Sequence, residues 1–79
     1  MRVVFTKAAV RDLRKIPVHD RDKLLSKIRT YAETGQGDVV AMKSLRDTYR
    51  IRSGNYRAIF EIQNDLLVIH AGHRKSVYR

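Results

Sequence analysis

The chain has 79 residues, which is enough for one domain around one core, and we expect that domain to span residues 1–79. Its composition, 43% hydrophobic and 32% charged without any cysteine, excludes a disordered chain, a membrane protein, disulfides and thiolate metal sites, and fits a cytoplasmic protein. Seventeen Lys and Arg against eight Asp and Glu give a net charge of +9, which indicates a polyanionic partner: nucleic acid first, with an anionic membrane surface, an acidic protein or a merely solvated basic surface as alternatives.

A short strand and a helix are expected at the start of the chain. Residues 2–5 favour a strand and form an apolar stretch too short for a signal peptide or a membrane span. Thr6 follows as an N-cap residue, and the helix should end before Pro17, because the residue before a proline disfavours helical backbone. Three apolar side chains of this helix are expected to be buried together: Val10, Leu13 and Ile16.

A second helix is expected from about Asp20 to Thr34. Its apolar residues recur at helical spacing, at positions 24, 25, 28, 31 and 32. Gly35 then provides a C-terminal stop. The two helices should form a hairpin with one apolar face each. The stretch of residues 39–43 has no period that assigns it to a helix or a strand.

The second half of the chain changes to the period of strands. Apolar residues alternate with arginines over residues 49–52 and continue over 56–62, with Gly54 and Asn55 suited to a two-residue hairpin turn between them. Residues 66–69 form an unbroken apolar run, which is typical of a central strand buried on both faces. The order β-α-α-β-β-β predicts an α+β domain, in which the helical hairpin covers one face of a mostly antiparallel, four-stranded sheet.

The turn predicts which residues of the hairpin face one another: Ser53 and Tyr56, Arg52 and Arg57, Ile51 and Ala58, Tyr49 and Phe60. The apolar members then share the helix-covered face, and Arg50, Arg52 and Arg57 share the opposite one. Arg52 directly across from Arg57 is repulsive unless an anion lies between them. A phosphate fits, because guanidinium forks match phosphate oxygens. A solvated sheet face with splayed arginines is the alternative.

The C-terminal segment of residues 72–79 gathers a histidine, three cations and a phenol. His73 could move a proton, Arg74 could stabilise the charge of a phosphorane, and Tyr78 could stack on a base. A basic tail with its tyrosine packed on the core is the alternative. The histidines show no metal-ligand spacing, and no glycine-rich phosphate loop, nucleophile elbow or carboxylate pair is present, so we expect neither metal nor cofactor. Chemistry on a phosphodiester, or plain binding, remains.

The segments TYRIRSGNYRAIFEI (48–62) and LVIHAGHRKSVYR (67–79) closely resemble the second half of the RelE/ParE toxin superfamily. That half has a Y-x-hydrophobic-x-x-G-x-Y-R-hydrophobic hairpin, then a strand and a G-H-R-x-x-V-Y ending, and residues 5–13 are similar to the first half. The resemblance implies a compact, microbial-RNase-like toxin that enters the ribosomal A site and cuts messenger RNA without a metal. In such enzymes the RNA 2′-hydroxyl attacks its adjacent phosphate and leaves a cyclic phosphate end.

Roles carry over from the superfamily by position. The resemblance implies that Arg50 and Arg52 match a basic pair that grips phosphate, that Arg57 and Arg74 match catalytic arginines, and that Tyr78 matches the tyrosine that orients the reacting nucleotide. Further RNA contacts are expected from Lys43, Arg46, Lys75 and Arg79. The best-known RelE enzymes have lysines at the basic pair, whereas arginine cannot realistically lose a proton, so His73 or Tyr78 is left as the general base.

The resemblance also implies partners. We expect a cognate antitoxin with an acidic, extended or helical segment that wraps the basic surface, besides the ribosome and messenger RNA. Operator DNA would be bound only through the antitoxin complex, and no membrane is involved. Since the chain stops at Arg79, the C-terminal helix of some relatives is expected to be absent. The alternatives are a ParE-like poison of DNA gyrase and a basic nucleic-acid or protein-binding module without activity.

Overall fold

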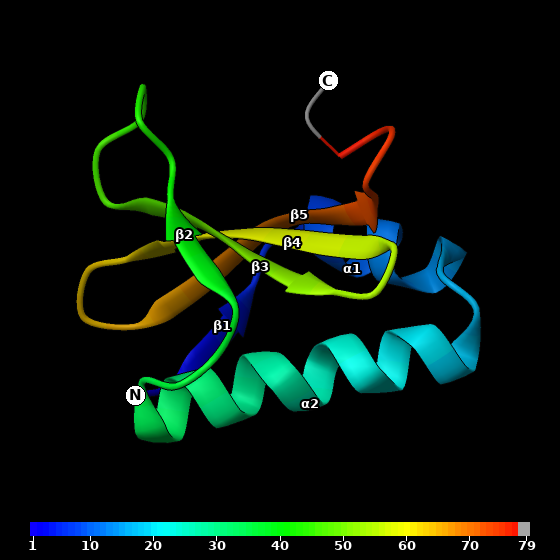
Figure 1. The fold of residues 1–79 in the computed structure, drawn as a ribbon, viewed down its shortest axis with the longest axis horizontal. Coiled ribbons are helices and arrows are strands. Elements are labelled where there is room, and N and C mark those ends of the chain that lie inside the picture. Colours follow the sequence, from blue (N-terminus) through cyan, green and yellow to red (C-terminus); the bar gives the residue numbers. More distant parts are fainter. Residues whose placement is uncertain (78–79) are drawn as a thin grey trace.

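A computed structural model describes residues 1–77; Tyr78 and Arg79 lie outside the described residues. Both helices lie on one face of a single sheet, with α2 running along the sheet in Figure 1 and α1 behind it. In chain order the elements are β1 (Val3–Phe5), α1 (Lys7–Lys15), α2 (Val18–Thr34), β2 (Val39–Ala41), β3 (Thr48–Ser53), β4 (Tyr56–Ile62) and β5 (Leu66–His73). The predicted α+β architecture is therefore confirmed.

The sheet has five strands in the order β1-β5-β4-β3-β2, one more than the four that were predicted. β1 pairs with β5 in parallel, and the other pairs are antiparallel. The extra strand, β2, arises from the stretch without an assignable period and pairs Val39 with Ile51. Because it is only three residues long, its alternation is too short to show in the sequence.

The predicted cap of α1 is confirmed, but one of its predicted core residues is wrong. The Thr6 hydroxyl accepts a hydrogen bond from the Ala9 N–H at 3.0 Å. Ala9 is fully buried, whereas the side chain of Val10 is 38% exposed. Leu13 and Ile16 follow Ala9 at i+4 and i+7, so these three share the face that meets the core, and Val10 lies beside it.

The second helix begins at Val18, two positions before the expected start, with Pro17 at its N-cap position. It ends at Thr34, and Gly35 adopts the left-handed conformation (φ 75°) that lets its N–H donate to the Tyr31 carbonyl. Its apolar face supplies three buried side chains: Leu24, Ile28 and Ala32.

The core fills the space between the helices and the sheet. Phe60 is fully buried, and its ring lies 5.6 Å from the rings of both Tyr31 and Tyr49. In β5, Leu66 and Val68 are fully buried, while residues 67 and 69 are partly exposed because neither α1 nor α2 covers that face, so the prediction of a strand buried on both faces was wrong for one of them. Within the described part of the chain, no helix is long and apolar enough to cross a membrane.

Candidate active site

The β3–β4 hairpin has the register that the sequence predicts. Arg52 pairs with Arg57, and the flanking pairs are Ser53 with Tyr56, Ile51 with Ala58 and Tyr49 with Phe60. Gly54 supplies the positive φ of the turn, at 59°. Ile51, Ala58 and Phe60 are buried against the helices, so the pleat directs Arg50, Arg52 and Arg57 to the other side. We call this side of the sheet the arginine face.

The facing pair Arg52 and Arg57 relieves its repulsion by turning in opposite directions. Arg52 Nε lies 2.6 Å from Oδ2 of Asp38, in the loop before β2, and the Arg52 N–H donates to the Asp38 carbonyl. Arg57 bends toward the hairpin turn instead, where Nη1 donates to the carbonyls of Gly54 at 2.8 Å and Tyr56 at 3.0 Å. For Arg52, the carboxylate of Asp38 thus takes the place of the anion that was expected between the two arginines.

Arg57 is a buried cation without a carboxylate partner among residues 1–77. Only 8% of the residue is exposed. The ion pairs of the described residues join Arg2 to Asp65, Arg52 to Asp38 and Asp12 to His70, and none reaches Arg57. Burying one charged side chain among neutral groups costs roughly several kcal/mol of folding free energy. Such a cost is typical of a site that binds an anion.

A second arginine joins the same turn from the C-terminal end of the chain. After β5, residues 73–77 form a turn in which the N–H groups of Ser76 and Val77 donate to the His73 carbonyl. The Arg74 N–H donates to the Asn55 carbonyl at 2.7 Å, directly beside the Gly54 carbonyl that Arg57 holds. The side chain of Arg57 and the backbone of Arg74, far apart in the sequence, are therefore bound to adjacent carbonyls of one hairpin turn. Arg74 and Lys75 are both exposed to solvent.

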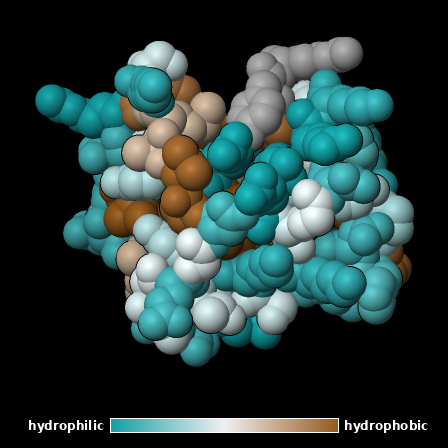
Figure 2. Space-filling view, viewed as in Figure 1, coloured by the Kyte–Doolittle hydropathy of each residue, from teal (hydrophilic) through white to brown (hydrophobic). Residues whose placement is uncertain are grey.

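The basic surface continues toward the other end of the hairpin. Arg50 lies opposite Val40 of β2 and Ile59 of β4, and together with Lys43 it lines a shallow cleft of about 200 Å³. Arg46 is exposed in the same β2–β3 loop. In Figure 2 hydrophilic surface dominates this view, and a hydrophobic patch gathers around β2. The described basic side chains thus form a track from the β2–β3 loop to the hairpin turn.

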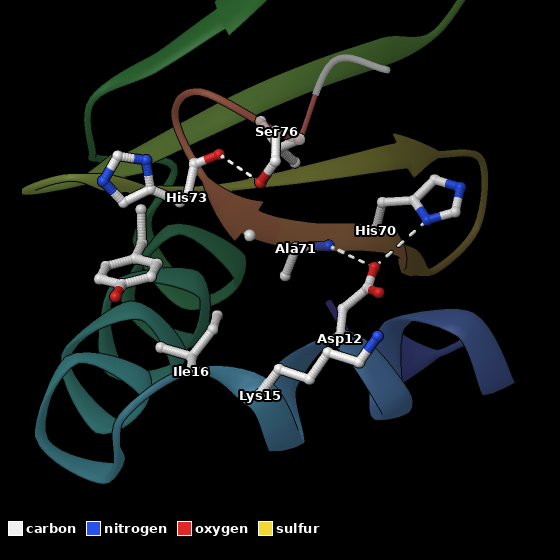
Figure 3. Close-up of a pocket in the computed structure, with 10 residues that line it drawn as sticks. Asp12, Lys15, Ile16, His70, Ala71, His73 and Ser76 are labelled. Atoms are coloured by element: carbon white, nitrogen blue, oxygen red, sulfur yellow. Dashed lines mark hydrogen bonds and ion pairs between the residues drawn. The ribbon is translucent and has the colours of Figure 1, made fainter.

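His73 is not brought to the arginine face. It pairs with Tyr56, whose side chain packs against the core, so the imidazole lies on the helix side of the sheet. Its ring meets that of Tyr56 edge-on, at 5.6 Å and 82°. Figure 3 shows it in a pocket above Ile16, and its Nδ1 accepts the Lys75 N–H at 3.2 Å. Tyr78 and Arg79, also expected in the site, lie outside the described residues.

Comparison with known proteins supplies the family. A family model described as the ParE toxin of a type II toxin–antitoxin system, parDE, matches residues 3–78. The chain belongs to the RelE/ParE toxin superfamily. It is 33% identical over 84 residues to Toxin RelE3 of Methanocaldococcus jannaschii, with 99% of this chain and 96% of the relative covered.

Solved structures agree with that membership. A chain of the RelB–RelE antitoxin–toxin complex from Methanococcus jannaschii matches with a TM-score of 0.81 at 30% identity, over 95% of this chain and 94% of that one. A chain of the intact E. coli RelBE toxin–antitoxin complex matches with a TM-score of 0.77 at 23% identity, over 91% of this chain and 94% of that one. The second match bears on the fold, which is that of RelE.

For this RelE/ParE family member, sequence reasoning missed two acidic residues at the site's borders. Asp38 holds Arg52, and Asp12 of α1 accepts the Ala71 N–H at 3.1 Å and lies 3.3 Å from His70 Nδ1. Asp38 directly precedes β2, which the sequence did not predict. Asp12 contacts residues of β5 that lie more than fifty positions further along the chain. No local sequence pattern around either aspartate predicts which residue it contacts.

Proposed function

We propose that the chain is the toxin of a type II toxin–antitoxin pair and an endoribonuclease that cuts messenger RNA in the ribosomal A site, so that translation stops. The observation that carries this proposal is Arg57, a buried cation without a carboxylate partner among residues 1–77, held at the turn that also binds the backbone N–H of Arg74. A cation of this kind is favourable where negative charge develops on a transferring phosphoryl group. The basic track leading to it supplies contacts for the neighbouring phosphates.

In the proposed mechanism the RNA supplies its own nucleophile. The 2′-oxygen bonds to the adjacent phosphorus and the 5′-oxygen leaves, so that one strand ends in a 2′,3′-cyclic phosphate and the other in a hydroxyl. Arg57 and Arg74 stabilise the extra negative charge of the phosphorane, and Arg50 and Arg52 hold the phosphate. DNA lacks the 2′-hydroxyl and is bound without being cut.

The reaction also needs a base for the 2′-hydroxyl proton and an acid for the leaving oxygen. Arginine cannot serve as the base, because its guanidinium does not lose a proton in proteins. The imidazole of His73 lies on the other side of the sheet from Arg57. We therefore assign the proton transfer to Tyr78 first and test His73 beside it, by comparing Tyr78→Phe and His73→Ala in a ribosome-dependent cleavage assay. Wild-type rates in both variants would end the assignment.

The partner in this proposal is an antitoxin. The RelE chains of Methanococcus jannaschii and E. coli were solved in complex with RelB. A net charge of +9 favours a partner segment rich in acidic side chains that covers the basic track. The toxin would then act in the cytoplasm when the antitoxin is removed, and would reach operator DNA only as part of the complex.

The test is to induce the chain without an antitoxin in a bacterium and to map messenger RNA 5′ ends. New ends inside translated codons, absent when Arg57→Met and Arg74→Ala are combined, are the expected result. A second candidate, a ParE-like poison of DNA gyrase, is favoured by the description of the matching family. Growth arrest with broken DNA and no new RNA ends would establish it, and no arrest would leave a basic binding module.

A further inference from the structure

A second cavity lies at the end of β5, beside α1 and the C-terminal turn, and no arginine lines it. It has a volume of about 430 Å³ and forms where α1, the end of β5 and the C-terminal turn meet (Figure 3). Pockets that bind small ligands start at about 300 Å³. Its polar and aromatic lining comes from four elements of the fold: Asp12, Lys15, Tyr56, His70, His73 and Ser76.

One wall of the cavity offers a hydrogen-bond acceptor. The Asp12 carboxylate accepts the Ala71 N–H at 3.1 Å, and His70 Nδ1 lies 3.3 Å away; both contacts end on Oδ2. Since an ionised carboxylate only accepts, His70 donates this bond. The second oxygen, Oδ1, makes no hydrogen bond within residues 1–77. A carboxylate so placed suits the hydroxyl groups of a ribose, as acidic side chains do in nucleotide-binding sites.

The opposite wall offers donors and flat rings. Because His73 Nδ1 accepts the Lys75 N–H, the proton of the neutral imidazole lies on Nε2, which is then a donor. The His73 ring and the Tyr56 ring meet edge-on at the end of the cavity, and such rings are stacking surfaces for nucleobases. Lys15 lies on the same wall as Asp12, on the last turn of α1 (Figure 3); it is exposed and forms no ion pair in the described part of the chain. Its ammonium group suits a phosphate.

We propose that this cavity binds a ribonucleotide. The phosphate is held by Lys15, the ribose hydroxyls by Asp12, and the base lies against His73 and Tyr56. The three chemical parts of a nucleotide thus each meet a matching group, and the charge of Asp12 is offset by its contacts with Ala71 and His70. This goes beyond the proposed function, because the residues that hold the nucleotide are not the arginines of the arginine face, and binding requires no cleavage.

The first experiment titrates the full chain with 5′-AMP and follows backbone amide shifts by NMR. We expect saturable shifts confined to residues 12–16, 56 and 70–77. The 2′-deoxy nucleotide should bind about 10-fold more weakly, because it lacks one hydroxyl for a charged acceptor. Equal binding of the deoxy nucleotide, or equal binding of inorganic phosphate, would overturn the proposal by showing an anion site without nucleotide recognition.

Matched variants separate a pocket effect from a charge effect. Lys15→Ala should weaken 5′-AMP binding about 10-fold, since one charge-assisted phosphate contact is lost. Lys27→Ala removes the same charge from an exposed position on α2 and should leave binding unchanged. Equal losses in both variants would contradict the assignment, because only the net charge would then matter.

Two further arms identify the source of the nucleotide and keep this inference apart from the proposed function. An oligonucleotide ApApA that binds more tightly than 5′-AMP and also shifts the amides of residues 43–52, in the basic track, identifies an RNA strand as the natural ligand. Equal affinity of the two identifies a free nucleotide. Cleavage of messenger RNA without 5′-AMP binding overturns the pocket and leaves the proposed function standing; binding without cleavage does the reverse.

Discussion

Replacing Arg57 by methionine tests whether this buried cation serves the fold or the chemistry. Methionine keeps an unbranched apolar side chain of similar reach and removes only the guanidinium. The variant loses hydrogen bonds to the carbonyls of Gly54 and Tyr56, each worth about 1.5–3 kcal/mol when the donor is charged. It also removes the desolvation cost of a buried ion, which is several kcal/mol, roughly the same size.

The two contributions nearly cancel, so the free energy of unfolding of Arg57→Met should lie within about 2 kcal/mol of the wild type. Gly54 is exposed, and water can satisfy its carbonyl in the variant. Cleavage, in contrast, should fall about 10²–10³-fold, as when one transition-state donor is removed.

The assays are urea unfolding followed by far-ultraviolet circular dichroism and ribosome-dependent cleavage of a defined message. Arg57→Lys is the matched control, because it keeps the charge but not the planar fork of donors; we expect activity between that of the wild type and that of Arg57→Met. A loss of more than about 4 kcal/mol in stability, the size found when a buried ion pair is broken, would refute the reasoning. So would full activity in the folded variant.

The other predictions concern the border of the site and the ends of the helices. Asp38→Asn should release Arg52 and tighten RNA binding, with the slope of log affinity against log salt concentration steeper by about one. An unchanged slope would contradict this. The free energy of unfolding should change by less than about 1 kcal/mol, because the ion pair is half exposed. Thr6→Val should lower the free energy of unfolding by about 2 kcal/mol in thermal or urea unfolding, since the hydroxyl accepts from the Ala9 N–H and donates to the Ile69 carbonyl. Thr6→Ser keeps the hydroxyl and should lose much less. Equal losses in the two variants would rule out the hydroxyl as the cause. Gly35→Ala should cost about 1 kcal/mol through its left-handed backbone, with Gly35→Asn closer to the wild type; a neutral Gly35→Ala would disprove the strain.

Much of the fold was predictable because its signals are local. The β3–β4 register follows from a two-residue turn and from alternation along each strand, and both act between neighbours in the chain. The same holds for the Thr6 cap and the Gly35 stop. Two predictions failed where the local sequence is ambiguous. β2 has only three residues, too few for its alternation to be recognised. Ala9 and Val10 are both apolar, so the sequence does not tell which of them is buried in the core.

In the candidate site, the alternation of residues was enough to predict which arginines share a face, because a strand places alternate side chains on opposite sides of the sheet. How these arginines are held became visible in the folded chain alone. The fold attaches Arg57 and Arg74 to one turn, pairs Arg52 with Asp38, and turns His73 toward the helices. The contacts of Arg57 with Gly54 and Tyr56 are local, but the others join segments whose distance in space depends on how the strands are ordered, and no local pattern of residues carries that information.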